Sequence, residues 1–145
     1  MVFVAAHRYS RLYQRVSQAQ RQVVLCLQHL GRDLIRSHAE SLRPGAVCQN
    51  EFWFLTFQAE GAAPISYDPN GHVVYRDWVG IWRDPQGVVW RGRVPLGGGP
   101  KPWAEVNLGL APSSIGTFQT PTGRRRLASS ITQLDLKLVG KQAQI

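Results

Sequence analysis

Hydrophobic residues in the first third of the chain recur at intervals of three and four positions. They are Tyr9, Leu12, Tyr13, Val16, Ala19, Val23, Leu27, Leu30 and Leu34. Because this spacing places side chains on one face of an α-helix, it predicts an amphipathic helix over about residues 4–40. Pro44 and Gly45 follow, as is typical where a helix stops.

A helix of this length would measure about 50 Å at 1.5 Å per residue. Strands of ordinary length span only about 20 Å, so a sheet would cover only part of the helix. The rest of the helix is expected to project beyond the globular body. An apolar face on a projecting helix requires another partner.

Two similar segments in the middle of the chain predict turns. DPNGHVVYR at residues 68–76 and DPQGVVWR at 84–91 each place Asp-Pro and Gly before β-branched and aromatic residues. Asp-Pro-x-Gly favours a tight turn, because Pro presets φ, Asp accepts backbone N–H groups and Gly tolerates positive φ. The pattern predicts two hairpins, at 64–77 and 79–94, in one antiparallel meander.

The remaining segments complete an α+β outline. VCQNEFWFLTF, residues 47–57, has the composition of a strand, GRVPLGGGPKPW, residues 92–103, has that of a loop, and residues 104–123 give mixed signals. Alternating apolar and polar residues within 128–140 predict a half-buried strand. We therefore expect a single α+β domain, with a long N-terminal amphipathic helix (residues 1–42) packed on an antiparallel β-meander head (residues 43–145).

The charge is strongly basic and unevenly placed. The 145 residues include 17 basic and 9 acidic ones, for a net charge of +8. Residues 1–32 contain no Asp or Glu, and their basic residues are Arg8, Arg11, Arg15, Arg21 and Arg32. Arg124, Arg125 and Arg126 form a second cluster, which we expect in an exposed loop and which is also compatible with a solubilising edge or a subunit contact. Arg favours bidentate contacts with phosphate or carboxylate, so DNA is a candidate partner.

Basic and aromatic residues are also interspersed along the predicted hairpins. They are Tyr75, Arg76, Trp78, Trp82, Arg83, Trp90, Arg91 and Arg93. Aromatic rings on a strand can stack on single-stranded bases while Arg neutralises phosphates, which would make a nucleic-acid-binding sheet. Strands more commonly direct aromatic rings to the core and charges to solvent, so both interpretations are kept.

The polar residues form no catalytic or metal-binding pattern. The histidines, at positions 7, 29, 38 and 72, lack zinc-ligand spacing, and the glycines at 97–99 lack the residues of a phosphate-binding loop. His29, at the edge of the apolar helix face, is expected to be a packed side chain. The sequence therefore predicts no catalytic residue, cofactor, metal or small-molecule substrate.

Cys26 and Cys48 are too few for a disulfide scaffold. If the chain turns back after the helix, Cys48 could approach Cys26 closely enough for one disulfide. The alternative is two small buried apolar side chains. No apolar run reaches the roughly 18 residues that a membrane-spanning helix needs.

The order of these segments carries a family resemblance. The stub VFVAA and the helix HRYSRLYQRVSQAQRQVVLCLQHLGRDLIRSHAES precede a meander with ISYDPNGHVVYR and a late strand, SITQLDLKLVG. This arrangement resembles the soluble part of type IV pilin-like proteins and is most similar to minor pilins and type II secretion pseudopilins. The family's processing signature, a Gly before a mature Phe or Met, an apolar run and a Glu at the fifth position, is absent. Either the membrane half of the helix precedes Met1, or the chain lies outside the family.

The resemblance implies a non-enzymatic filament subunit, a minor or initiating component in pilus assembly, secretion or DNA uptake. Its partners would be other pilin or pseudopilin subunits and the inner membrane, which it would reach through a preceding N-terminal segment, with the head in the periplasm or outside the cell. The residues expected to pack in the filament are Tyr9, Leu12, Tyr13, Val16 and Val23. Those expected to contact DNA or another partner are Arg83, Arg91, Arg93, Arg124, Arg125 and Arg126.

Overall fold

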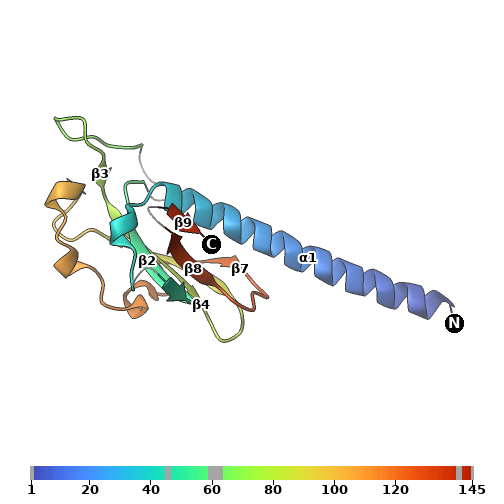
Figure 1. Ribbon diagram of the computed structural model, residues 1–145. Helices are drawn as coiled ribbons and strands as arrows, with labels where there is room; N and C mark the ends of the chain where they lie inside the picture. The colour runs from blue at the N-terminus through green and yellow to red at the C-terminus, as the bar shows by residue number, and fades with distance from the viewer. Residues whose placement is uncertain (1, 45–46, 59–63, 140–141, 145) are drawn as a thin grey trace.

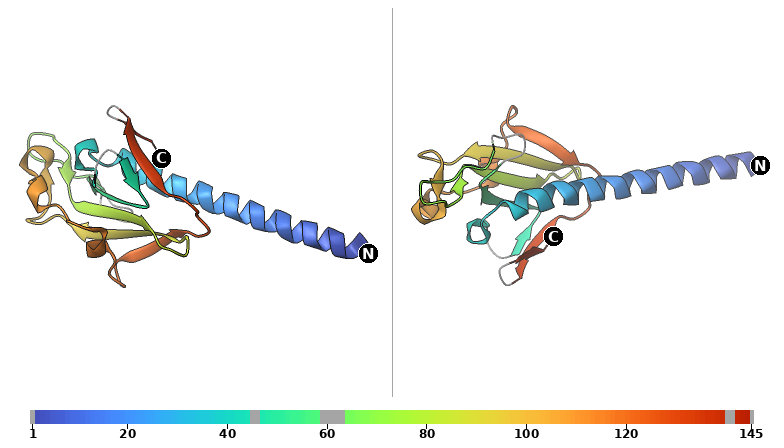
Figure 2. Two further views of the ribbon diagram at one scale, coloured as in Figure 1. Left: turned by 60° about the horizontal axis from the view of Figure 1, so that its bottom comes forward. Right: turned by 90° about the horizontal axis from the view of Figure 1, so that it is seen from above.

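A single long helix and an antiparallel sheet head make up the computed structural model, which describes residues 2–44, 47–58, 64–139 and 142–144. This arrangement confirms the predicted α+β class. Helix α1 spans Val2–Ile35. Its C-terminal half lies along the head, and its N-terminal half stands clear of the head in every view (Figures 1 and 2). The predicted projection of the helix is therefore present in the fold.

The helix ends at Ile35, five residues before the predicted boundary near residue 40. At this point the backbone changes partners. The Ser37 hydroxyl donates to the carbonyl oxygen of Leu34 (2.7 Å), while the N–H of His38 donates to the carbonyl oxygen of Leu55 (3.2 Å). The chain after α1 therefore pairs with a strand of the head, which replaces the hydrogen bonds that a longer helix would have made.

Two sheets and a short strand pair build the head. The main sheet has the order β2-β4-β5-β7, formed by Glu51–Thr56, Asp77–Arg83, Val89–Pro95 and Arg124–Ala128. A second sheet has the order β1-β8-β9, formed by Val47–Gln49, Asp135–Val139 and Gln142–Gln144. Strand β3 (Val74–Tyr75) pairs with β6 (Lys101–Pro102). All of these pairs are antiparallel.

The second predicted hairpin is confirmed, and the first forms as a short hairpin whose arms pair at Tyr67↔Val73. Strands β4 and β5 pair from Asp77↔Pro95 to Arg83↔Val89 around the turn at Asp84, where Gly87 has φ 80°. At the earlier turn Asp68 accepts backbone N–H groups as expected. The strand that follows this turn, however, pairs with β6, outside the main sheet. The two turns therefore do not belong to one meander.

Two other predicted boundaries are wrong. Residues 95 and 101–102, expected only in a loop, lie in β5 and β6, and residues 92–94, which the predicted hairpin and loop both included, lie in β5. The expected strand over 128–140 is divided, since β7 ends at Ala128 and β8 begins at Asp135. Between them the N–H of Ile131 donates to the carbonyl oxygen of Gly87 (2.9 Å), so this segment is held by the β4–β5 turn and forms no strand of its own.

The main sheet is covered on both faces. Helix α1 packs on one face, where Phe52, Phe54, Val79, Ile81 and Leu136 are buried. The other face is covered by the segment with mixed sequence signals, which forms the 3₁₀ helices η2 (Trp103–Glu105), η3 (Leu108–Leu110) and η4 (Ile115–Phe118). Phe118 packs there against Gly80 and Gly92, which are register partners on β4 and β5. Only glycine leaves room for the Phe118 ring at Gly80 and for the Phe118 backbone at Gly92.

Candidate functional site

An exposed apolar stripe runs along α1, from its projecting part to Val23 beside the head. It consists of the residues predicted to pack in a filament, Tyr9, Leu12, Tyr13, Val16 and Val23. Tyr9 and Tyr13 are 75% and 77% exposed, and every side chain from Arg8 to Gln18 is classed as exposed. Five large apolar side chains on one helix are more than isolated surface residues, and such a patch is typical of a protein contact. The structure thus leaves this stripe open to a partner.

The helix meets the head through a face that overlaps one edge of the stripe. Cys26, Leu30 and Asp33 are buried against the sheet. At about 100° per residue, Leu30 points in the same direction as Leu12, whereas Cys26 and Asp33 point about 40–60° to one side of it. The stripe residues nevertheless remain exposed, so the head does not cover the stripe.

A buried ion pair fixes this rotation of the helix. Arg91 of β5 is 7% exposed, and its guanidinium donates to both carboxylate oxygens of Asp33, at 2.6 and 3.1 Å. Sequence reasoning placed Arg91 among the candidate surface contacts, and its burial with Asp33 corrects that assignment. A sequence clue existed, because Asp33 is the first acidic residue of a helix otherwise rich in Arg.

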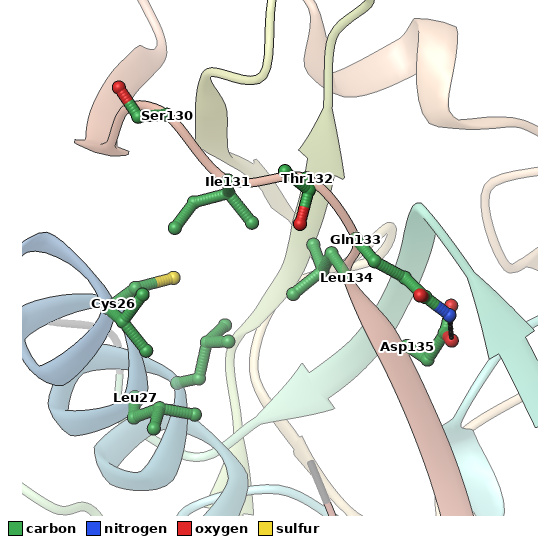
Figure 3. Close-up of a pocket in the computed structure, with 10 residues that line it drawn as sticks. Cys26, Leu27, Ser130, Ile131, Thr132, Gln133, Leu134 and Asp135 are labelled. Atoms are coloured by element: carbon green, nitrogen blue, oxygen red, sulfur yellow. Dashed lines mark hydrogen bonds between the residues drawn. The ribbon is translucent and has the colours of Figure 1, made fainter. Parts of the chain in front are cut away.

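An apolar groove opens beside this seam, and sequence reasoning did not identify it. The groove has a volume of about 380 Å³. One wall is the helix, with Val23, Cys26, Leu27 and Leu30, and the other is the chain from Ser130 to Asp135 (Figure 3). Asp135 is the one charged side chain among these described lining residues, and it accepts a hydrogen bond from Gln133. We refer to it as the α1–β8 groove.

The arginines of residues 124–126 do not form the loop predicted for them, because they lie in the edge strand β7. All three are exposed, but they point to opposite faces of the sheet, since successive strand residues alternate. The guanidinium of Arg124 lies 4.7 Å from the centre of the Trp90 ring. Arg125 lies on the helix face, 3.2 Å from Nδ1 of His29, which is half-buried as expected for a packed histidine.

The two remaining candidate arginines differ in exposure. Arg93 on β5 is exposed. Arg83 is half-buried, and its Nε–H donates to the carbonyl oxygen of Ile131 (2.6 Å), so this side chain helps to hold the segment that lines the α1–β8 groove. Among the candidate arginines of the head, the exposed ones are therefore Arg93 and the β7 arginines.

The aromatic rings of the predicted hairpins are mostly unavailable for base stacking. Trp78 and Trp82 are 2% and 5% exposed in the core beneath η4, and Tyr75 is also buried. Trp90 is half-buried, and its Nε1–H donates to Asp84 (2.8 Å). The ordinary interpretation of these aromatics, as core residues, is the one that the structure supports.

Both cysteines are buried thiols of the same core, so the candidate disulfide is not formed. Burial raises the pKa of the Cys26 thiol. The Cys48 thiol lies 3.7 Å from the carbonyl oxygen of Arg43. The alternative expectation, two small buried apolar side chains, describes them correctly.

A second depression, of about 690 Å³, lies by the β3–β6 pair. Its wall includes His38, whose ring stacks on Trp103 with a centroid distance of 3.6 Å and an interplanar angle of 9°. Burial lowers the pKa of His38. Because these two rings contact each other, their apolar faces are already occupied within the fold.

Comparisons with known proteins add no identification. No protein-family model matches the sequence, and no curated protein or solved structure matches it either. Within the described residues, no helix is both long and apolar enough to cross a membrane, and no group of three metal-binding side chains occurs.

Proposed function

We propose that this chain is a non-enzymatic subunit of a type IV pilus or pseudopilus filament, a minor or initiating component in pilus assembly, secretion or DNA uptake. One observation carries the proposal: α1 extends beyond the head and exposes the apolar stripe there. Burial of this stripe between subunits would remove five large apolar side chains from water, and burial of each is worth about 1.5–3 kcal/mol. In a filament, neighbouring subunits would therefore cover the apolar stripe that the head leaves exposed.

The anchor of the subunit is part of the same proposal. An inner-membrane segment would precede residue 1 and continue α1, with the head in the periplasm or outside the cell. The intact mass and N-terminal sequence of the protein recovered from its own cells test this. An added apolar segment of about 25 residues that begins with a methylated Phe or Met supports the anchor. A soluble chain that starts at Met1 contradicts it.

The stripe itself is tested with a charged substitution. Val16→Asp and Tyr13→Asp each introduce a carboxylate into the stripe, outside the head, so we expect an intact head and no recovery of the subunit in sheared filaments. Gln14→Asp is the matched control, since it makes the same charge change on the opposite side of the helix. Near-UV circular dichroism reports the head. Incorporation of Val16→Asp at the level of Gln14→Asp would refute helix packing as the basis of assembly.

The alternative function, a nucleic-acid-binding sheet, has less support. Stacking requires exposed rings, and Trp78 and Trp82 are buried. The arginines of β7 are exposed and could contact DNA phosphates. Such a contact fits the filament proposal, because a subunit in a DNA-uptake filament would use a basic surface.

A further inference from the structure

The α1–β8 groove and the apolar stripe adjoin each other on one side of the molecule. Val23 belongs to both, and Leu27, one turn further along the helix, lines the groove and is 43% exposed. The opposite wall contributes Ile131 and Leu134, whose side chains face the helix across the groove (Figure 3). A partner that fills the groove therefore also covers the head-proximal end of the stripe.

The projecting part of α1 is complementary in charge to this groove. Arg8, Arg11 and Arg15 lie along one flank of the stripe, at helical positions about 40–140° from Leu12 and Val16. No acidic residue occurs in residues 1–32 to neutralise them. The groove carries a single charged group, the carboxylate of Asp135, at the side away from the helix. A basic, apolar helix segment fits an apolar groove with an acidic edge.

The same charges disfavour the packing of two stripes against each other. Two such helices would bring their arginines close together without an intervening carboxylate, and like charges in contact are destabilising. Entry into the groove instead gives these arginines an anionic neighbour. The charge pattern thus distinguishes between two ways of burying the same apolar residues.

We propose that the α1–β8 groove of one subunit receives the projecting part of α1, residues 8–18, of a second copy of this chain, with Asp135 facing the arginine flank. The inference rests on the proposed filament function and specifies its subunit contact. Stripe and groove are different surfaces of one molecule, so their pairing is heterologous. Each subunit that offers a stripe also offers a groove, and such a contact continues into an open filament unless its rotation closes a ring.

Complementary variants test this contact on the full chain. Thr132 is exposed and lines the groove, so Thr132→Arg places a cation opposite the incoming arginines without disturbing the core. Val16→Asp disrupts the stripe and leaves the groove intact. Thr117→Arg is the matched control, an exposed threonine on η4, on the opposite face of the main sheet. Sedimentation velocity over a wide concentration range gives the size of the assemblies.

We expect the wild type and Thr117→Arg to form large, salt-sensitive assemblies, and Thr132→Arg and Val16→Asp each to remain monomeric at concentrations at least tenfold higher. An equimolar mixture of these two variants should form one-to-one dimers and nothing larger, because only the stripe of Thr132→Arg and the groove of Val16→Asp are intact. If Thr132→Arg assembles like the wild type, or the mixture stays monomeric, the groove contact is wrong and the filament proposal stands. If the wild type stays monomeric, the groove contact is wrong, and the filament proposal is decided by recovery of the subunit in sheared filaments.

Discussion

Asp33 and Arg91, separated by 58 residues in sequence, form a buried two-point ion pair that joins α1 to the middle of the main sheet. A planar guanidinium that meets both carboxylate oxygens restricts rotation of the helix more strongly than apolar packing alone does. The orientation of the exposed stripe relative to the head therefore depends on this pair. The Asp33–Arg91 pair is therefore expected to affect both the stability of the protein and its assembly.

Removal of one partner of this pair should be costly. We expect Asp33→Ala to lower the free energy of unfolding by about 3–5 kcal/mol, because it leaves the buried guanidinium of Arg91 without its counter-ion. Urea denaturation followed by tryptophan fluorescence measures the change. Arg32→Ala, at an exposed neighbouring position, serves as the control and should change stability by no more than about 0.5 kcal/mol. Equal stability of the two variants would exclude a structural role for the pair.

The glycine pair beneath Phe118 gives a second prediction. A Cβ at Gly80 would overlap the Phe118 ring, and one at Gly92 would overlap the backbone carbonyl oxygen of Phe118. A ring can rotate aside, whereas the backbone of η4 must move as a whole. We expect Gly92→Ala to destabilise the protein by at least the 1–3 kcal/mol typical of overpacking, and Gly80→Ala by less. Thermal unfolding measures both.

The control for this pair is Gly31→Ala, near the C-terminal end of α1, where a Cβ meets nothing within 4 Å. Alanine is the better helix former, so this variant should gain about 0.8–1 kcal/mol. In the double variant Gly80→Ala/Phe118→Ala, the loss caused by Gly80→Ala should be smaller than in the wild-type background. A loss of the same size in both backgrounds would show that Phe118 is not the source of the clash.

The turn at Asp84 predicts a specific pKa change. The Nε1–H of Trp90 donates to this carboxylate, together with the N–H groups of Val88 and Gln86, and these bonds lower the pKa of Asp84 from its ordinary value of 3.8. We expect Trp90→Phe to raise the pKa of Asp84, because it removes the largest contribution. Carboxyl NMR titration measures the shift. Asp68 is the control, since its lowered pKa arises from His72 and Asn70 and should not move.

The lowered pKa of Asp84 also determines how the stability of the protein depends on pH. Because the pKa of Asp84 is lower in the folded chain than in the unfolded one, its contribution to stability is present above about pH 4 and is lost as the pH falls toward the folded-state pKa. The melting temperatures of the wild type and Asp84→Ala should therefore converge as the pH is lowered from about 5 to about 2. A constant difference across this range would contradict the role assigned to the ionised carboxylate.

Features governed by local chemistry were predictable from the sequence. The apolar period gave α1 and its projection, and Asp-Pro-x-Gly gave both turns, including positive φ at Gly71 and Gly87. The end of α1 was not predictable, because it is set by hydrogen bonds from residues 36–38 to β2. Periodicity describes what one segment prefers, whereas a boundary depends on the segment that competes for its backbone.

The parts of the candidate site that the sequence did not reveal depend on distant partners. In the sequence, Arg91 looks like an ordinary charged residue of a strand, and only the fold shows that it lies beside Asp33. The cover over the aromatic rings comes from residues 103–118, which have no regular period, and the glycines that accommodate Phe118 lie on two different strands. The α1–β8 groove likewise joins two segments about 100 residues apart in the sequence.

The arginines of β7 lead to a prediction about DNA. All three are exposed at the edge of the main sheet, Arg124 beside Trp90 on one face and Arg125 beside His29 on the other. If this edge follows a DNA backbone, the triple variant with Gln at residues 124–126 should bind duplex DNA more weakly and with a flatter dependence of log K on log salt. The slope should fall by about 0.9 for each phosphate contact that is lost.

A second triple variant, which removes the same charge from another part of the protein, shows whether DNA binds at β7 in particular. Arg8→Gln, Arg11→Gln and Arg15→Gln together remove three exposed positive charges from the projecting part of α1. If binding reflects only the net charge of +8, both triple variants should lose the same affinity and slope, since non-specific attraction depends on total charge. If β7 forms the contact, the loss should be confined to its own variant. Unchanged affinity in that variant would remove β7 from consideration and leave the filament contacts of α1 as the protein's interaction surface.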